Sequence, residues 1–240
     1  MALVLAVDVS RSMSYEELRI QRQGYVAAIS SPEVLRAIGQ GAYGKIAVTF
    51  FEWAGNYHAR EIIGWTLIGS AADAESVASK LLEGASQGAR RTSISGAIDR
   101  ASSLFETLPF LADRHVIDIS GDGPNNQGGP VSEARDKALA KGVAINGLPL
   151  MTRGGFGSRF NIDDLDEYYR RCVTGGPGSF VIPVNDWAQF PEAVRRKLVL
   201  EIGNVRMQPK IWRAQLLFSK PYDCLIGEKI WQQRQWQFDN

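Results

Sequence analysis

The sequence is poor in the side chains that bind soft metals and in long apolar runs. Its 240 residues include two cysteines and two histidines, too few for a zinc cage or a nitrogen-rich ligand cluster. A single disulfide between Cys172 and Cys224 stays open. No apolar run of the sequence approaches the roughly 20 residues that cross a bilayer, and the N-terminus lacks a basic segment followed by a long apolar stretch. We therefore expect no membrane association and a cytoplasmic protein, or a periplasmic or exported one if a signal peptide was removed.

An excess of charge of one sign is also missing. The 27 basic and 26 acidic residues leave a formal net charge of +1, which offers no electrostatic case for a nucleic-acid partner. With 45% hydrophobic and 22% charged residues the composition is that of a globular protein, not of a disordered chain. The length predicts one large domain or one domain with an appendage, with a core that needs no structural metal.

Short apolar segments alternate with segments of helical spacing along most of the chain. The alternation is typical of an α/β fold: a doubly wound, mostly parallel sheet with one antiparallel edge strand and helices on both faces. The predicted strands are 3–7, 45–53, 61–68, 116–120, 143–150 and 179–184, and the predicted helices are 14–29, 71–82, the segment from after Thr92 to Pro109, 132–141, 163–173 and 186–202.

Oxygen side chains gather where predicted strands end and where one helix begins. Asp8, Ser10 and Ser12 follow the first strand, Thr92 precedes a helix, and Asp122 follows a later strand. In doubly wound sheets, ligands bind outside the carboxyl ends of the strands. Two carboxylates and three hydroxyls are hard ligands that suit Mg²⁺ or Mn²⁺. Because no general base is evident beside them, they favour an adhesive site over a hydrolytic one.

The three loops resemble the metal-ion-dependent adhesion site (MIDAS) of von Willebrand factor A domains. The likeness extends over about residues 2 to 203 to an uncharacterised bacterial family of short, usually exported A-domain proteins. It is carried by segments 21–25, 92–99, 120–126, 145–149 and 195–202. The resemblance implies a Rossmann-like von Willebrand factor A fold with a metal position that faces an acidic residue of a partner protein.

The resemblance also implies a role for each candidate ligand. Ser10, Ser12 and Thr92 would bind the ion through their hydroxyls, and Asp8 and Asp122 directly or through water. The middle of the first loop departs from the usual pattern, because Arg11 stands where such domains usually have glycine. Its guanidinium either clamps the partner carboxylate or weakens metal affinity by repulsion.

We therefore expect a non-enzymatic, divalent-metal-dependent protein–protein interaction module, with the loops around Arg11, Trp53 and Gly154 as candidates for partner specificity. Two alternatives stay open. The first is an Mg²⁺-dependent phosphohydrolase that uses Asp8 as nucleophile, although Ser10 stands where such enzymes generally carry a further acid. The second is a structural subunit of a larger assembly whose metal site is vestigial.

Some neighbouring polar residues have simpler interpretations. Asp118 lies inside a predicted strand, so we exclude it from the site and expect it to pair with Arg114 or His115. Asn125 and Asn126 follow a Gly-Pro turn sequence and are interpreted as turn residues.

The last 36 residues differ in composition from the rest. They hold three of the six tryptophans and six basic against three acidic residues. We predict an A-like domain over 1–204 and a basic, aromatic docking or assembly tail over 205–240. The tail folds back on the domain, docks into a neighbouring subunit, or has no fixed structure. Its apolar residues do not form a single helical face of the kind that binds membranes.

Overall fold

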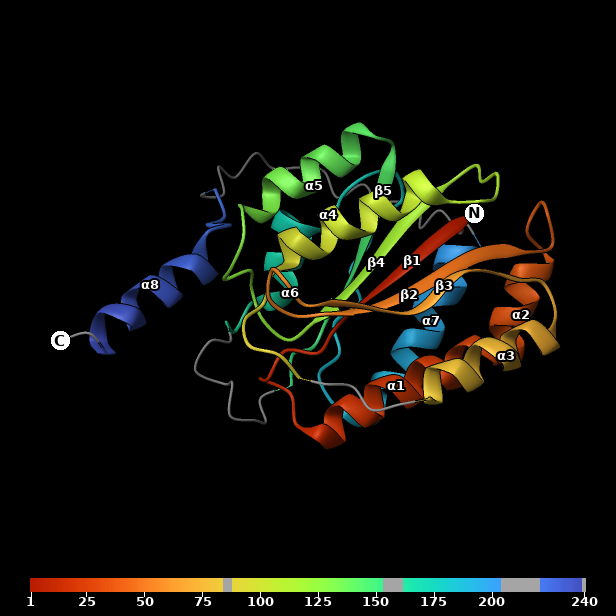
Figure 1. The fold of residues 1–240 in the computed structure, drawn as a ribbon, viewed down its shortest axis with the longest axis horizontal. Coiled ribbons are helices and arrows are strands. Elements are labelled where there is room, and N and C mark those ends of the chain that lie inside the picture. The colour runs from red at the N-terminus through yellow and green to blue at the C-terminus, as the bar shows by residue number, and fades with distance from the viewer. Residues whose placement is uncertain (84–87, 153–161, 204–220, 239–240) are drawn as a thin grey trace, which may run out of the picture.

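A computed structural model describes residues 1–83, 88–152, 162–203 and 221–238, with side chains up to Arg234 in the last range. Five strands form one sheet in the order β3-β2-β1-β4-β5 (Figure 1). β1 pairs in parallel with β2 and β4, β4 with β5, and β2 antiparallel with β3. The strands are β1 (Ala2–Asp8), β2 (Ile46–Trp53), β3 (Ala59–Ile68), β4 (His115–Gly121) and β5 (Val143–Pro149). The predicted fold class, including its antiparallel edge strand, is confirmed.

Helices cover both faces of the sheet. The main helices are α1 (Tyr15–Ile29), α2 (Pro32–Gly39), α3 (Ala71–Leu82), α4 (Ile94–Leu104), α5 (Val131–Ala140), α6 (Leu165–Tyr168), α7 (Phe190–Ile202) and α8 (Ile226–Phe238). The α1, α2, α3 and α7 helices lie on one face, and α4, α5 and α6 on the other (Figure 1). Short turns of helix occur at Phe105–Thr107 and Trp187–Gln189, and a π-helix at Tyr169–Val173.

Strand β1 shows why the sheet is buried on both sides. All of its residues are buried. Leu3, Leu5 and Val7 belong to the core on the α1 side, whereas Val4 and Ala6 belong to the core on the α4 side. Successive side chains of a strand point to opposite faces, so an uninterrupted apolar run fills both cores at once.

Two predicted elements differ from the structure. Segment 179–184 forms no strand; Val181 and Val184 make isolated bridges with Gly147 and Leu150. Pro183 lies between them and has no N–H to donate to a ladder. In addition, the predicted helix 163–173 is shorter and ends in the π-helix.

Helix α2 was not predicted. Ser31 caps it by accepting a hydrogen bond from the N–H of Val34, and Pro32 occupies its first turn. Both are standard signals of a helix start. The helix has only eight residues, too few for its apolar spacing to have been recognised as a helical period.

The carboxyl ends of the strands meet at one edge of the sheet. The register places Asp8 of β1 opposite Trp53 of β2, and Val7 of β1 opposite Ser120 of β4. The loops that follow β1, β2 and β4 therefore leave the sheet side by side. This edge is where the sequence places its candidate metal ligands.

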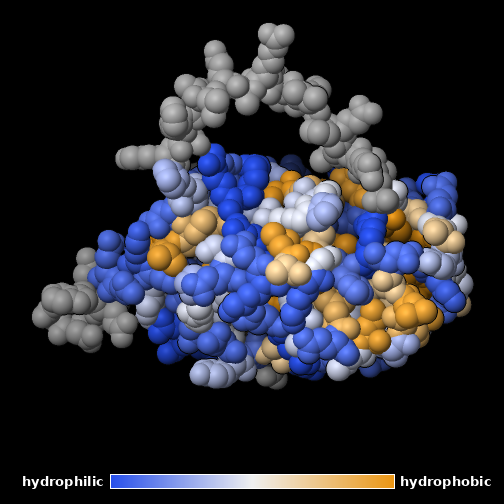
Figure 2. All heavy atoms as spheres, turned by 90° about the horizontal axis from the view of Figure 1, so that it is seen from above, coloured by the Kyte–Doolittle hydropathy of each residue, from blue (hydrophilic) through white to orange (hydrophobic). Residues whose placement is uncertain are grey.

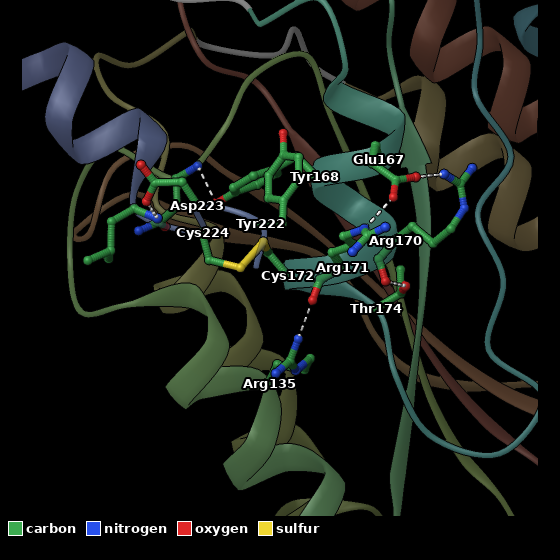
Figure 3. The surroundings of a disulfide bond; sticks show 12 residues. Arg135, Glu167, Tyr168, Arg170, Arg171, Cys172, Thr174, Tyr222, Asp223 and Cys224 are labelled. Carbon is green, nitrogen blue, oxygen red and sulfur yellow. Dashed lines mark hydrogen bonds and ion pairs between the residues drawn. A yellow bond between two sulfur atoms is a disulfide. The ribbon is translucent and has the colours of Figure 1, made fainter. Parts of the chain in front are cut away.

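A disulfide holds the start of the tail against the domain. Cys172, in the π-helix, is bonded to Cys224, two residues before α8 (Figure 3). The hydroxyl of Tyr222 donates a hydrogen bond to Asp164, 2.9 Å away. The described start of the tail thus folds back on the domain, while α8 extends outward from the body (Figure 1). Residues 204–220 lie outside the described part.

The surface over α4 and α5 is mainly hydrophilic. Figure 2 shows hydrophobic residues there in separate groups between hydrophilic ones.

Within the described ranges, the helices are all too short or too polar to cross a membrane.

Candidate metal centre

Asp8 is the innermost of the candidate ligands. Its side chain is fully buried at the end of β1. The N–H of Ser10 donates to Asp8 Oδ1 over 2.7 Å, and Gln21 Nε2 of α1 donates to the Asp8 carbonyl over 3.0 Å. Among the residues that the structure describes, buried Asp8 Oδ2 has no hydrogen-bond partner. The local fold thus orients the carboxylate and leaves one of its oxygens unsatisfied.

Two serines connect the first loop to Asp122 in the loop after β4. Ser12 Oγ donates to Asp122 Oδ1 over 2.7 Å, and Ser10 Oγ lies 2.8 Å from Ser12 Oγ and 3.4 Å from the same carboxylate oxygen. Ser10 and Asp122 are buried. The structure therefore brings together four of the five candidate ligands.

The surroundings of the two carboxylates disfavour their charged forms. Burial raises the pKa of Asp8 well above its ordinary value, and the charge of Asp122 raises it further. Burial raises the pKa of Asp122 to about 6, although the hydrogen bond from Ser12 acts in the opposite direction. Buried charges are stable when they are paired or coordinate a metal, so a cation at this position would relieve both.

Thr92 lies next to this group through its backbone. Its N–H donates a hydrogen bond to Asn126 Oδ1, and its carbonyl accepts one from the Asn126 N–H. Both bonds are 2.9 Å long. Ser93, not Thr92, caps α4, since its Oγ accepts from the N–H of Gly96. A parallel bridge between Ser10 and Ala89 also joins the loop before Thr92 to the first loop. Coordination by the Thr92 hydroxyl stays a prediction.

The two asparagines after Asp122 do more than form a turn. Asn126 holds Thr92, and Asn125 Oδ1 accepts from the N–H of Ser95 in the first turn of α4 over 3.0 Å. Both asparagines therefore connect the loop after β4 to the start of α4. The available signal was their position three and four residues after a candidate ligand, where amide side chains can bond to a neighbouring backbone.

The expected partners of Asp118 were wrong. This fully buried carboxylate lies 2.6 Å from Lys197 Nζ of α7, which also pairs with Glu201. Lys197 approaches from a helix distant in sequence, so no local pattern points to it. The pairing supports the exclusion of Asp118 from the metal centre.

The donor set fits a hard divalent ion. It offers two carboxylates and hydroxyl oxygens, the ligands that Mg²⁺ and Mn²⁺ prefer. The unpartnered Asp8 Oδ2 is the oxygen best suited to receive an ion. No cluster of three or more His, Cys, Asp or Glu side chains of the kind that holds metal occurs in the described ranges. Binding here would therefore depend on the serine and threonine hydroxyls.

Comparison with solved structures supports the fold. The chain is similar to proximal thread matrix protein 1 of the mussel byssus, with a zinc-occupied MIDAS motif (13% identity, 84% of this chain and 45% of that chain, TM-score 0.58). It is also similar to a von Willebrand factor type A protein from Catenulispora acidiphila (16%, 84% and 42%, 0.56) and to the pilus adhesin SpaC from Lactobacillus rhamnosus GG (12%, 85% and 30%, 0.62).

The chain spans less than half of the length of these three structures. At this level of identity the likeness shows a shared α/β fold. No curated protein matches the chain. A family model, described as a protein of unknown function (DUF1194), matches residues 1–206. The chain thus belongs to this family, and it has a von Willebrand factor A-like α/β fold.

Proposed function

We propose that the chain is a divalent-metal-dependent protein–protein interaction module that binds an acidic residue of a partner. Asp8, Ser10, Ser12, Thr92 and Asp122 would hold Mg²⁺ or Mn²⁺. The observation that carries the proposal is the meeting of two buried carboxylates with two serine hydroxyls at the edge of the sheet. Von Willebrand factor A-like domains often mediate protein interactions, and the mussel protein has a zinc-occupied MIDAS motif.

The chain's own residues prepare this site by fixing two carboxylates. Asp8 is held by the Ser10 N–H and Asp122 by the Ser12 hydroxyl, so neither carboxylate needs to be reoriented when a ligand arrives. Such preorganisation lowers the entropic cost of binding. A bound ion would supply a Lewis acid for the partner carboxylate.

Two arginines beside the site favour an acidic partner. Arg11 and Arg90 are exposed and lie on adjacent backbones, because the N–H of Arg11 donates to the carbonyl of Ala89 over 2.9 Å. Positive charge at the rim attracts negatively charged surfaces and raises association rates. This arrangement supports the interpretation of Arg11 as a clamp for the partner.

An exposed tyrosine in a fixed turn adds apolar contact area to the same edge. Tyr57 in the turn between β2 and β3 is 98% exposed. The turn is fixed from below, since Ser93 Oγ donates to Asn56 Oδ1 over 2.8 Å and the Asn56 N–H donates to Gln127 Oε1 over 3.0 Å. Exposed aromatic residues on preorganised loops are frequent hot spots of protein interfaces.

The metal site is tested by calorimetric titration of Mg²⁺ and Mn²⁺ into the wild-type protein and into Asp122→Ala. We expect saturable binding to the wild type and a loss of at least about tenfold in affinity in the variant. The substitution leaves the site with one carboxylate, that of Asp8, in place of two. Asp99→Ala is the matched control, because Asp99 is an exposed carboxylate within α4 and outside the candidate ligands. Equal affinity of wild type and Asp122→Ala would refute the site.

The adhesive role is tested by affinity capture from the native source with and without EDTA. Proteins that are retained with Mg²⁺ and released by the chelator are candidate partners, and the Asp122→Ala variant should not retain them. Turnover of a simple phosphate ester, abolished in Asp8→Asn, would favour the phosphohydrolase instead.

A further inference from the structure

The tail helix α8 contacts both loops that complete the candidate metal centre. The guanidinium carbon of Arg91, directly before Thr92, lies 3.2 Å from the centre of the Trp231 ring. Asn125, three residues after Asp122, donates through Nδ2 to Glu228 Oε1 over 2.7 Å. One helix therefore binds the loop of Thr92 by a cation–π contact and the loop of Asp122 by a hydrogen bond to a charged group.

Gly227 allows the close approach of the helix to the second of these loops. A Cβ added at Gly227 would lie 2.0 Å from the carbonyl oxygen of Asn125. No side chain can occupy that space, so α8 reaches its position only with glycine here. Its first turn is thus seated directly on the backbone of the loop that follows Asp122.

The residue that Trp231 contacts has an unusual backbone. Arg91 has a φ of 78°, and within the described ranges no other residue except glycine has a positive φ. Non-glycine residues adopt this conformation at a cost, and they keep it where surrounding contacts hold them. The indole of Trp231 is one such contact. The backbone conformation of Arg91 in turn sets the position of Thr92, the next residue.

Asn125 transmits the second contact into the site. Its Oδ1 accepts from the N–H of Ser95 in α4, and its own N–H donates to the hydroxyl of Tyr168 over 3.1 Å. Glu228 adds a bond to the same side chain and is half-buried. The amide thus joins α8, α4 and the loop after β4 at one point.

The disulfide keeps α8 in place. Cys224 lies two residues before the helix and is bonded to Cys172, which is fully buried. A single 13-residue helix is marginally stable alone in water. The bond therefore holds its first turn where the contacts of Gly227 and Glu228 can form.

We propose that α8 is an intramolecular brace for the metal centre, in which Gly227, Glu228 and Trp231 are positioning residues for the loops of Thr92 and Asp122. The metal affinity of the domain then depends on the tail. This inference rests on the proposed metal site. It concerns a segment beyond the part of the chain that matches the family model.

The test compares Gly227→Ala and Trp231→Ala with Gln232→Ala in the full chain. Gln232 lies on the same helix but is exposed, so its variant controls for general effects on α8. Mn²⁺ affinity is measured by calorimetry, and amide hydrogen exchange at residues 91–95 and 125–126 is measured in the metal-free protein. We expect Gly227→Ala and Trp231→Ala to lower Mn²⁺ affinity about tenfold, as loss of supporting contacts does at metal sites, and to accelerate exchange in both loops.

Unchanged exchange and unchanged Mn²⁺ affinity in both variants would overturn the brace, provided that the wild type binds Mn²⁺. Absence of Mn²⁺ binding by the wild type would instead contradict the proposed metal site. The proposed effect of α8 on metal affinity would then also be wrong. The exchange rates would then still decide whether α8 orders the two loops. The two failures are therefore distinguishable.

Discussion

Asp118, Lys197 and Glu201 form a buried cluster in which one cation faces two carboxylates. All three side chains are at most 2% exposed. Burial raises the pKa of Asp118 to about 7, because desolvation and the charge of Glu201 together outweigh the attraction of Lys197. Asn146 donates to Glu201 Oε1 over 2.8 Å, so part of the cluster is satisfied by a neutral amide.

This pKa predicts a pH-dependent stability. The folded protein keeps a proton on Asp118 up to about pH 7, whereas the carboxyl of the unfolded chain loses it near its ordinary value of 3.8. The free energy of unfolding should therefore fall as pH rises from about 4 to 7, by at most about 1.4 kcal/mol per pH unit from this group. Asp118→Asn cannot lose a proton and should remove this contribution.

Urea unfolding of both proteins at pH 5, 6, 7 and 8 measures the effect. The difference between wild type and Asp118→Asn isolates Asp118 from other titrating groups, among them Asp8 and Asp122. A difference that does not change with pH would contradict the raised pKa.

The contact between α1 and α7 depends on a glycine. A Cβ at Gly24 would lie 2.5 Å from the ring of Phe190, which is buried between Tyr25 and Trp187, with ring centres 5.9 and 5.5 Å away. An added methyl group would therefore have to displace a buried ring that packs against two other aromatic side chains. Segment 21–25 is one of those that carry the family resemblance. Its Gly24 is thus required by the packing of α1 against α7.

We expect Gly24→Ala to lower the free energy of unfolding by about 1–2 kcal/mol, since overpacking of about 1–3 kcal/mol exceeds the helix propensity gained by alanine. Gly39→Ala is the matched control, because Gly39 is also helical and no atom of the described part of the chain lies within 4 Å of its added Cβ. Denaturant unfolding of the two variants gives the comparison. A higher free energy of unfolding in Gly24→Ala would contradict the prediction, because it would show that the contact between α1 and α7 can accommodate the added methyl group.

Strand and helix elements followed from local patterns to differing extents. The apolar runs of β1 and β4 and the helical apolar spacing of segment 14–29 predicted these elements, because burial on two faces and a helical period leave signals within a few residues. Segment 179–184 has the same β-rich composition. It forms only bridges with β5 and the residue after it, because Pro183 has no N–H to donate to a continuous ladder.

The contacts between the tail and the domain join residues that are far apart in the sequence. The disulfide joins residues separated by 52 positions, and Tyr222 packs against Tyr168 with ring centres 6.2 Å apart. Two cysteines alone did not predict the bond, because sequence does not show whether two distant cysteines meet. Their Cα atoms lie 5.5 Å apart in the fold, within the normal range for a disulfide.

The bond predicts how the protein behaves when its chain is cut. With a protease site inserted between Gly203 and Pro221, the cleaved protein should run as one species on a denaturing gel without reductant and as two with it. In Cys224→Ser the two pieces should separate without reductant. Separation of the cleaved wild-type protein without reductant would show that Cys172 and Cys224 are not bonded.

The α/β architecture and the convergence of Asp8, Ser10, Ser12 and Asp122 could be read from the chain alone. Buried parallel strands have a local apolar signature, and residues that follow such strands share one edge of the sheet. The partners of Asp118, the bridging role of Asn125 and the seat of α8 could not be read in this way. These contacts join segments distant along the chain, and whether such groups meet depends on packing in three dimensions, which leaves no periodic trace in the sequence.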